Sequence, residues 1–231
     1  MIAIIIMKFL AILIVGYLLG SIPFGLLIAR YFAKVDIRNF GSGKIGTTNV
    51  LRTAGKKAAT IAFLLDFAKG ALAVLFAALI FGRNYLVVGN FGLGLLVAQC
   101  LAALAAIAGH NWSIFLGFKG GRGVATFFGG LAALSPVVAL FGGQVFAIGV
   151  GLTRFASLGS IAGVVGTYTI LIPLTLFNGF PVEYLVYSLI GTIVIIYMHR
   201  DNISRLLAGK ERKLGEAAQS ADTSPTEKSK E

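Results

Sequence analysis

Residues 2–28 read IAIIIMKFLAILIVGYLLGSIPFGLLI, and Lys8 is the only charged side chain in this run. About 20 consecutive apolar residues are enough to cross the hydrocarbon core of a bilayer as a helix. The run is longer than the apolar core of a signal peptide and has no clear small-residue cleavage site. We therefore interpret it as a retained first membrane helix.

The composition extends this interpretation to most of the chain. Hydrophobic residues make up 57% of the sequence and charged residues 13%, and the mean hydropathy is +0.89. These values exclude an ordinary soluble domain. The net charge of +11 does not indicate nucleic-acid binding, because no stretch interleaves basic and aromatic residues. The single cysteine, Cys100, excludes an intramolecular disulfide and lies in an apolar run, where we expect it to pack inertly.

The apolar runs predict an all-α, polytopic membrane protein with about seven transmembrane helices. The predicted helices cover roughly residues 2–32, 58–82, 86–108, 123–135, 137–152, 159–177 and 184–199. The count depends on residues 123–152, because about 30 residues is long for one span. Ser135-Pro136 is a natural break, since proline removes a helix hydrogen bond, so we predict two short helices there.

The distribution of Lys and Arg predicts the orientation. With seven spans, loops 33–57, 109–122 and 153–158 share a side with the C-terminal segment and hold most of the basic residues, whereas the opposite loops hold Arg83 and few others. Short cytoplasmic loops are enriched in Lys and Arg, so the N-terminus is expected outside and the C-terminus in the cytoplasm. We expect one membrane domain, residues 1–213, followed by a disordered polar tail, residues 214–231.

Three polar motifs interrupt the apolar runs. Motif 1 (residues 41–52) reads GSGKIGTTNVLR. It is not a Walker A loop, because Thr47 stands where that loop needs Lys. Consecutive small residues can still expose backbone N–H groups to an anion, and a helix that begins at Thr47 or Thr48 would add its free N–H groups. The alternative is a flexible loop in which Ser42, Thr48 and Asn49 cap helices.

Motif 2 (residues 109–126) reads GHNWSIFLGFKGGRGVAT and contains a second glycine turn, Gly120–Gly123. Arg122 could bind phosphate oxygens with its forked guanidinium group. The alternative is an arginine that only orients the chain in the membrane. Asp66 and Lys69, three residues apart, are expected to form a mutual, shallow ion pair, because an isolated charge in a bilayer is costly.

Motif 3 (residues 199–211) reads HRDNISRLLAGKE. His199 and Asn202 would share one face of a helix, and His199 could act as a base or a donor. The chain has only two histidines, with few carboxylates near them, so we expect no metal site. No His is followed five residues later by Asp, and no Gly-x-Ser-x-Gly elbow is present. An acyl-enzyme mechanism therefore lacks an obvious nucleophile.

Together the motifs resemble those of the bacterial acyl-phosphate:glycerol-3-phosphate acyltransferases, integral membrane enzymes of phospholipid synthesis. The resemblance runs from Gly20 to Glu211, nearly the whole chain. In place of the family's usual residues, this chain has Lys44 for Asn in motif 1 and Arg122 for Lys in motif 2. A short segment, residues 154–157, resembles a family segment that contributes a serine.

The resemblance implies transfer of a fatty acyl group from acyl phosphate to the sn-1 hydroxyl of glycerol 3-phosphate. Because the sequence shows no nucleophile–base pair and acyl phosphate is already activated, we expect direct transfer without an acyl-enzyme, and we expect no cofactor. It implies catalytic roles for His199, Asn202, Ser42 and Arg52. It implies substrate or phosphate binding by Gly43, Lys44, Gly46, Thr48, Asn49, Gly120, Gly121, Arg122, Gly123, Thr126, Ser157 and Arg205, and a structural role for Glu211. The site would face the cytoplasm of a bacterial cell, and a soluble acyl-phosphate synthase is a candidate partner. The alternative function is a membrane transporter of organic phosphates.

Overall fold

The structure, a computed structural model, describes residues 2–88 and 91–216, and within them it is almost entirely helical. The α-helices are α1 (Ile2–Ser21), α2 (Phe24–Ala33), α3 (Thr47–Phe81), α4 (Leu95–Asn111), α5 (Val124–Leu134), α6 (Pro136–Thr153), α7 (Ala156–Asn178), α8 (Val182–Met198) and α9 (Arg200–Leu207). Two 3-10 turns, η1 (Ile37–Asn39) and η2 (Ile114–Leu116), lie in the loops. The strands β1 (Leu86–Val88) and β2 (Phe91–Leu93) pair in antiparallel fashion, with Val87 opposite Gly92.

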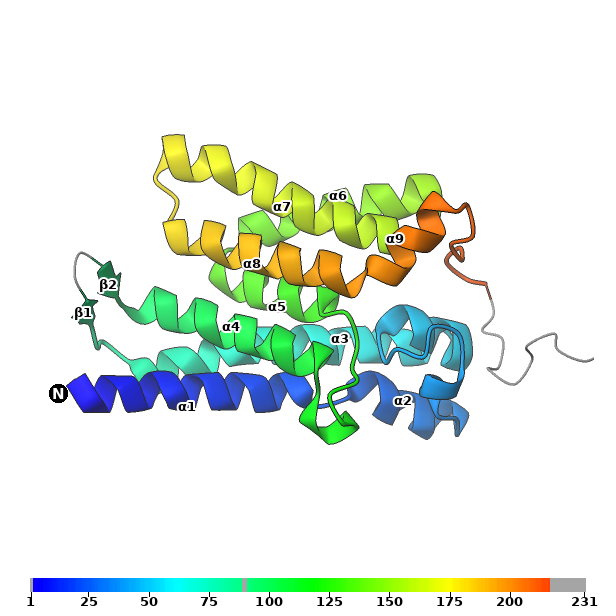
Figure 1. The fold of residues 1–231 in the computed structure, drawn as a ribbon, viewed down its shortest axis with the longest axis horizontal. Helices are drawn as coiled ribbons and strands as arrows, with labels where there is room; N and C mark the ends of the chain where they lie inside the picture. The colour runs from blue at the N-terminus through cyan, green and yellow to red at the C-terminus, as the bar shows by residue number, and fades with distance from the viewer. Residues whose placement is uncertain (1, 89–90, 217–231) are drawn as a thin grey trace, which may run out of the picture.

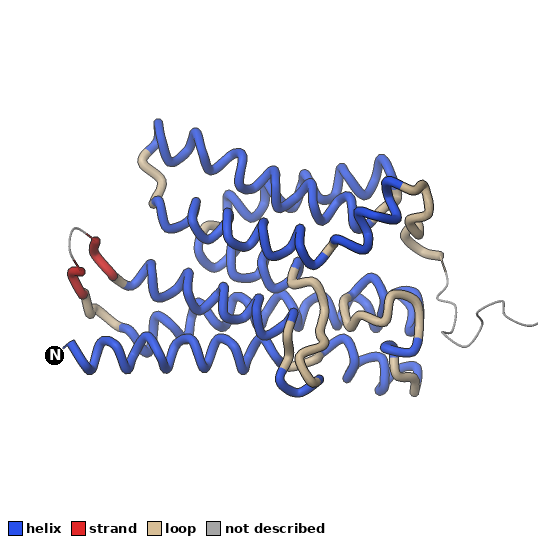
Figure 2. The backbone as a smooth tube through the Cα atoms, in the orientation of Figure 1, coloured by secondary structure: helices blue, strands red, loops and turns tan. Residues whose placement is uncertain are grey.

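The long helices form two groups with α5 between them (Figure 1). One group contains α1, α3 and α4, and the other contains α6, α7 and α8. The β1–β2 hairpin lies at one end of the bundle, near the N-terminus. The long loops after α2 and α4, together with the segment after α9, lie toward the opposite end (Figure 2).

Helix α5 is the centre of the core and is buried along most of its length. Phe127 stacks on Tyr187 of α8, whose hydroxyl donates to the carbonyl of Phe127 at 2.8 Å. Glycines bring α3 and α5 into close contact: a Cβ on Gly70 would overlap the carbonyl of Thr126, and one on Gly129 would overlap that of Phe67. Small residues at such crossings let membrane helices pack backbone to backbone.

Proline and glycine divide the helices, and some predicted boundaries were wrong for this reason. The predicted helix 2–32 is broken at Pro23, which has no N–H to continue the helix. The predicted helix 86–108 begins only at Leu95, because residues 86–88 and 91–93 form the hairpin. Helix α3 begins well before residue 58 and is interrupted at Gly55, whose φ of 82° and ψ of 178° are not helical. The predicted break at Ser135-Pro136 is confirmed, with Pro136 in the first turn of α6.

In the described part of the chain, five helical segments are long and apolar enough to cross a membrane, or six if the bent pair of α8 and α9 counts as one span. The five are Ile2–Ala33, Thr47–Phe81, Leu95–Leu116, Pro136–Thr153 and Ala156–Asn178. Helix α5 has only 11 residues and falls below this length. The fold is thus that of an all-helical, multi-span membrane protein.

Candidate active site

The three polar motifs meet around one cavity of about 290 Å³. Ser42 and Lys44 reach it from the loop before α3, Arg122 from the loop before α5, and His199 from the junction of α8 and α9. These segments are far apart in sequence, and the antiparallel course of the helices brings them to the same end of the bundle. The cavity is therefore lined by cations and hydrogen-bonding groups from all three motifs.

One wall of the same cavity is apolar. Leu51 and Phe63 contribute to it from α3, and Phe146 and Val150 from α6. Leu214, beyond α9, also lines it. A cavity with cations on one side and aliphatic and aromatic groups on another suits a molecule with an anionic head and an apolar chain.

A smaller cavity of about 30 Å³ shares residues with the larger one and is more polar. Arg52, Arg122, Ser157, His199 and Asn202 contribute to its lining. The Nε atoms of Arg52 and Arg122 are buried, and neither has a hydrogen-bond partner among the described residues. Unpartnered guanidinium donors beside a polar cavity are suited to an anionic ligand.

Helix N-termini add to the positive potential of these cavities. Helix α3 begins at Gly46–Thr48, α5 at Gly123–Ala125 and α7 at Ala156, and these residues line the larger cavity. The first N–H groups of a helix have no partner within the helix, and the helix dipole favours negative charge at that end. The site is therefore built to hold anions even before its side chains are considered.

Cations crowd the site. Burial lowers the pKa of Lys44, and the nearby positive charge of Arg122 lowers it further. Burial also lowers the pKa of Arg122 to about 10, with a contribution from Arg205. Because the cations destabilise one another, an anion bound among them would relieve this repulsion.

Asn49 organises the loop of motif 1. Its Nδ2 donates to the carbonyls of Ile37, Phe40 and Lys44 at 2.9–3.0 Å, and its Oδ1 accepts from the backbone of Ser42 at 3.3 Å. Asn49 is buried, although it also borders the larger cavity. Its amide therefore holds the loop in shape, which leaves Ser42 and Lys44 to face the cavity.

The glycines of motifs 1 and 2 differ from the expected anion-binding nests. The N–H of Gly43 donates to the carbonyl of Phe40 at 3.0 Å. The N–H groups of Gly120 and Gly121 donate to the carbonyls of Asn111 and His110 at 3.1 and 2.9 Å. These donors are occupied by the protein, so in this conformation Gly43, Gly120 and Gly121 shape the loops and do not present free N–H groups.

His199 ends α8 and lies at the wall of both cavities. Its Nδ1 is 2.8 Å from the carbonyl of Ile195, which makes Nδ1 the donor and leaves Nε2 as an acceptor in the neutral ring. Burial lowers the pKa of His199 to about 4, and the charge of Arg122 contributes. The ring is thus neutral near pH 7 and can accept a hydrogen bond.

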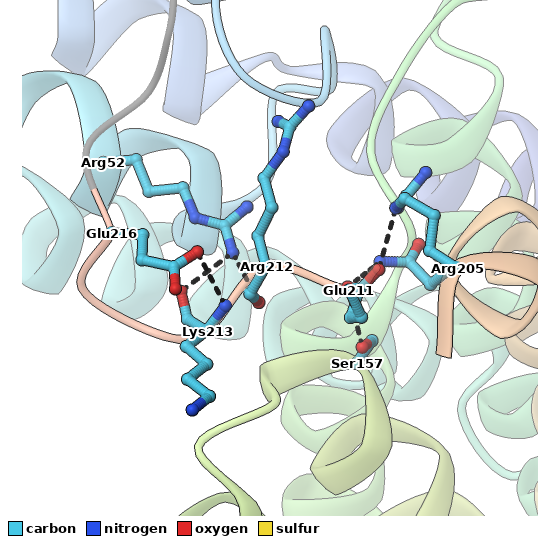
Figure 3. A network of polar contacts seen from close by, with 8 residues as sticks. Arg52, Ser157, Arg205, Glu211, Arg212, Lys213 and Glu216 are labelled. Atoms are coloured by element: carbon cyan, nitrogen blue, oxygen red, sulfur yellow. Dashed lines mark hydrogen bonds and ion pairs between the residues drawn. The ribbon is translucent and has the colours of Figure 1, made fainter. Parts of the chain in front are cut away.

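Glu211 joins three of the predicted site residues (Figure 3). Its Oε1 accepts hydrogen bonds from Ser157 at 2.9 Å and from Asn202 at 2.6 Å, and its Oε2 accepts from Arg205 at 2.8 Å. Burial raises the pKa of this carboxyl group, but the three hydrogen bonds outweigh burial and lower it. A carboxylate held in this way is a weak base and a strong structural link.

A family model described as glycerol-3-phosphate acyltransferase matches residues 10–209. The chain belongs to this family. It is 62% identical over 211 residues to glycerol-3-phosphate acyltransferase 3 of Dehalococcoides mccartyi (strain CBDB1), covering 91% of this chain and 98% of that protein. It is 42% identical over 214 residues to glycerol-3-phosphate acyltransferase of Clostridioides difficile (strain 630), covering 91% and 98%.

Two solved structures share the fold of this acyltransferase. The first is PlsY (YgiH), an integral membrane glycerol 3-phosphate acyltransferase, in its glycerol 3-phosphate form, with a TM-score of 0.77, 39% identity, and coverage of 90% of this chain and 96% of that one. The second is the lysophosphatidic acid form, with a TM-score of 0.74 and 38% identity, covering 89% and 94%. Membership of this family excludes the alternative function from the sequence analysis, a membrane transporter of organic phosphates.

Most of the predicted site residues of the acyltransferase line one of the two cavities. Those in the larger one are Ser42, Lys44, Gly46, Thr48, Asn49, Arg122, Gly123 and His199, and those in the smaller one include Arg52, Ser157, Asn202 and Glu211. Thr126 differs, because it is fully buried in α5 and its carbonyl packs against Gly70 of α3. Arg205 reaches the site through its ion pair with Glu211.

The sequence did not predict the contacts that residues 212–214 make beyond Glu211. Arg52 donates to the carbonyls of Arg212 and Lys213 at 3.1 and 3.3 Å. The N–H of Leu214 donates to the carbonyl of Arg154 at 2.7 Å. Ordered contacts thus continue into the predicted polar tail, of which residues 217–231 lie outside the described part. These contacts use backbone carbonyls, which every residue has, so no sequence pattern could have indicated them.

Two further residues on the cavity wall come from membrane helices. Asp66 and His110 line the larger cavity, and the predicted mutual pairing of Asp66 with Lys69 is confirmed by a distance of 2.8 Å between Oδ1 and Nζ. Within residues 2–88 and 91–216, no group of three or more His, Cys, Asp or Glu side chains could hold a metal ion.

Proposed function

We propose that this acyltransferase transfers a fatty acyl group from acyl phosphate to the sn-1 hydroxyl of glycerol 3-phosphate. The products are 1-acylglycerol 3-phosphate and inorganic phosphate. The observation that carries the proposal is the pair of buried, unpartnered arginine Nε atoms, on Arg52 and Arg122, beside a small polar cavity that shares lining residues with a larger cavity that has one apolar wall. The reaction would be the first acylation of phospholipid synthesis.

The phosphate groups of both substrates would bind at the polar end. Arg52, Arg122 and Lys44 supply positive charge, and the N-termini of α3, α5 and α7 supply N–H groups. Charge-assisted hydrogen bonds of this kind are the strong ones. Two anionic substrates in one site explain why several cations are held close together despite their mutual repulsion.

The acyl chain would extend along the apolar wall. Phe63 and Phe146 lie on α3 and α6, which both carry exposed large apolar side chains. A chain bound there remains close to the bilayer, while its phosphate reaches the cations. The reactive carbonyl would then lie between the apolar and polar parts of the cavity.

Direct transfer fits these residues better than an acyl-enzyme. Acyl phosphate is a mixed anhydride, so the enzyme needs mainly to position the hydroxyl and to stabilise developing negative charge. Nε2 of His199 would accept a hydrogen bond from the glycerol hydroxyl, and the proton of that hydroxyl would pass to His199 or to a substrate phosphate.

Two candidate nucleophiles are poorly placed to form an acyl-enzyme. Cys100 donates to the carbonyl of Glu183 at 3.6 Å, near the start of α8 and away from the motifs. Ser157 faces Glu211, whose carboxylate is already engaged by Asn202 and Arg205.

We further propose seven membrane crossings, with the N-terminus outside and the active site at the cytoplasmic side of a bacterial plasma membrane. After α1–α2, each of α3, α4, α5, α6, α7 and α8 runs opposite to the helix before it (Figure 1). The 11 residues of α5 span about 16 Å, but α5 is enclosed by other helices and does not need to match the bilayer thickness. A soluble acyl-phosphate synthase would supply the donor from the cytoplasmic side.

The activity is tested with protein purified in detergent. Acyl phosphate and glycerol 3-phosphate should give 1-acylglycerol 3-phosphate and phosphate in equal amounts, without sealed vesicles, and acyl-coenzyme A should not replace the donor. Absence of product, or acylation of the second hydroxyl, would refute the proposal.

The orientation is tested by cysteine labelling in intact cells, in a Cys100→Ala background. Reagents that do not cross the membrane should leave Lys44→Cys, Lys119→Cys and Lys210→Cys unlabelled until the membrane is opened. Labelling of these positions from outside would reverse the proposed topology.

A further inference from the structure

A cluster of three buried polar residues lies beside the larger cavity, outside the groups assigned above to phosphate binding. Asp66 and Lys69 come from α3, and His110 comes from the last turn of α4. Lys69 Nζ is 2.8 Å from Asp66 Oδ1, and the same oxygen is 3.5 Å from His110 Nδ1. All three side chains are at most 4% exposed.

The members of the cluster face different parts of the protein. Asp66 and His110 line the cavity. Lys69 instead donates to the carbonyl of Ile22 at 3.0 Å, at the break between α1 and α2. Charged groups inside membrane helices are rare and commonly mark a functional site. A buried ion pair is also weak support for stability, because desolvation opposes the attraction between the charges.

His110 supports the glycine turn of motif 2. Its carbonyl accepts from the N–H of Gly121 at 2.9 Å, and the carbonyl of Asn111 accepts from Gly120 at 3.1 Å. The ring packs directly against Gly121, because a Cβ at that position would overlap His110 Nε2. The ring and the end of α4 thus fix the backbone that immediately precedes Arg122.

We propose that Asp66 and His110 are positioning residues for Arg122. Lys69 pairs with Asp66, Asp66 lies 3.5 Å from Nδ1 of the His110 ring, and the Nε2 edge of the ring packs against Gly121 of the glycine turn. Arg122 then enters the cavity with its guanidinium group in place for a phosphate. This inference rests on the proposed function, in which Arg122 binds a substrate phosphate.

The test is a double-mutant cycle with full-length protein in detergent, using steady-state acyl transfer. Arg122→Ala first identifies which substrate, acyl phosphate or glycerol 3-phosphate, shows a raised KM. Asp66→Asn and His110→Gln should each raise the KM of that same substrate roughly tenfold, with a smaller change in kcat. In the Arg122→Ala background, the same substitutions should add almost nothing, because residues that act through one group are not additive.

Ser188→Ala is the matched control. Ser188 is a fully buried polar residue of α8, and its Oγ has no hydrogen-bond partner in the described part of the chain. Its substitution should leave both KM values unchanged in either background. If His110→Gln does not fold, the pair Asp66→Asn with Lys69→Met removes both charges together and should show the same KM increase and the same lack of additivity.

Four results separate the possible failures. Equal KM effects in the wild-type and Arg122→Ala backgrounds would overturn the positioning role and leave the proposed function intact. A loss of melting temperature without a change in KM would likewise show a purely structural cluster. A wild-type KM in Arg122→Ala would overturn both the phosphate role of Arg122 and this inference, and a wild-type protein without acyl transfer would refute the proposed function itself.

Discussion

The hydroxyl of Ser157 donates to Oε1 of Glu211 at 2.9 Å, although 54 positions separate these residues in the chain. Ser157 lies in the first turn of α7, and Glu211 follows α9. The same carboxylate accepts hydrogen bonds from Asn202 and Arg205 (Figure 3). Glu211 therefore ties α7, α9 and the C-terminal segment together at the edge of the polar cavity.

Replacement of Glu211 should loosen this edge of the site. Glu211→Ala leaves Ser157, Asn202 and Arg205 without their shared acceptor, and each hydrogen bond to a charged group is worth about 1.5–3 kcal/mol. We expect a lower melting temperature in detergent together with reduced acyl transfer. Glu216→Ala is the control, because exposed Glu216 accepts only from the backbone of Lys213 among the described contacts and should change neither quantity. A Glu211→Ala variant as stable as the wild type would contradict the linking role.

Arg52 is expected to contribute directly to substrate binding. Arg52→Ala should lower kcat/KM at least about tenfold, because a charged hydrogen bond to phosphate contributes about 1.5–3 kcal/mol. Lys56→Ala is the control and should have little effect, because Lys56 is an exposed cation just beyond the interruption of α3 at Gly55. Arg52 also donates to the carbonyls of Arg212 and Lys213, so the melting temperature must be measured in parallel. An unchanged kcat/KM in a folded variant would remove Arg52 from the site.

The contributions of the charge and of the forked geometry of Arg122 can be measured separately. Arg122→Lys keeps the positive charge but loses the forked geometry, whereas Arg122→Ala loses both. Since the family that the motifs resemble has Lys at this position, we expect the Lys variant to stay within about tenfold of wild-type kcat/KM. The Ala variant should fall by at least that factor. Complete inactivation by Arg122→Lys would show that the family geometry does not transfer to this chain.

The depressed pKa of His199 predicts a pH-dependent stability. The pKa is about 4 in the folded protein, below the ordinary value of 6.5, because burial and Arg122 disfavour the charged ring. Between these two pH values the unfolded chain binds a proton that the folded protein does not, so stability falls as the pH is lowered from about 6.5 to about 4. The contribution of His199 is complete above pH 6.5.

Melting temperatures measured from pH 4 to 7 check this expectation. His199→Gln, which does not titrate, should show a smaller decrease across this range than the wild type. Identical slopes for the two proteins would mean that His199 is not the group that titrates.

Direct transfer predicts that no acyl-enzyme accumulates. Mass spectrometry of protein quenched after mixing with acyl phosphate alone should show the unmodified mass. His199→Ala should be strongly slowed, since general acid–base help contributes about 10²–10⁴-fold, yet it should still bind acyl phosphate. A stoichiometric acyl adduct on Ser42, Ser157 or Cys100, formed and discharged at the turnover rate, would establish a two-step mechanism instead.

Several features of the fold could be predicted because they depend on local sequence. The apolar runs indicate membrane helices wherever they are long enough, and Pro136 ends one helix and begins the next by the loss of a single N–H. The predicted boundaries were wrong at Pro23 and where glycine or strand pairing determines the end of a helix. Gly55 interrupts α3 through its positive φ, and residues 86–88 pair with residues 91–93 although both short apolar segments could equally have been helical.

The chemistry of the site could also be predicted, but its hydrogen bonds could not. The cationic side chains of Arg52 and Arg122 and the imidazole of His199 can be recognised in the sequence as groups suited to phosphate binding and proton transfer. The order of the three motifs identifies the family. The sequence could not show that the side-chain amide of Asn49 donates to backbone carbonyls of the loop of motif 1. It also could not show that the N–H groups of Gly120 and Gly121 donate to the carbonyls of Asn111 and His110 at the end of α4.

The sequence by itself therefore determined a helical membrane protein with three anion-suited polar motifs, since hydrophobicity, charge and proline act locally along the chain. Only the tertiary structure decided that Glu211 joins Ser157, Asn202 and Arg205, and that Asp66 lies against His110. The physical reason is that each donor has several acceptors of equal chemical quality available. Which of them it meets depends on how helices from distant parts of the chain pack together.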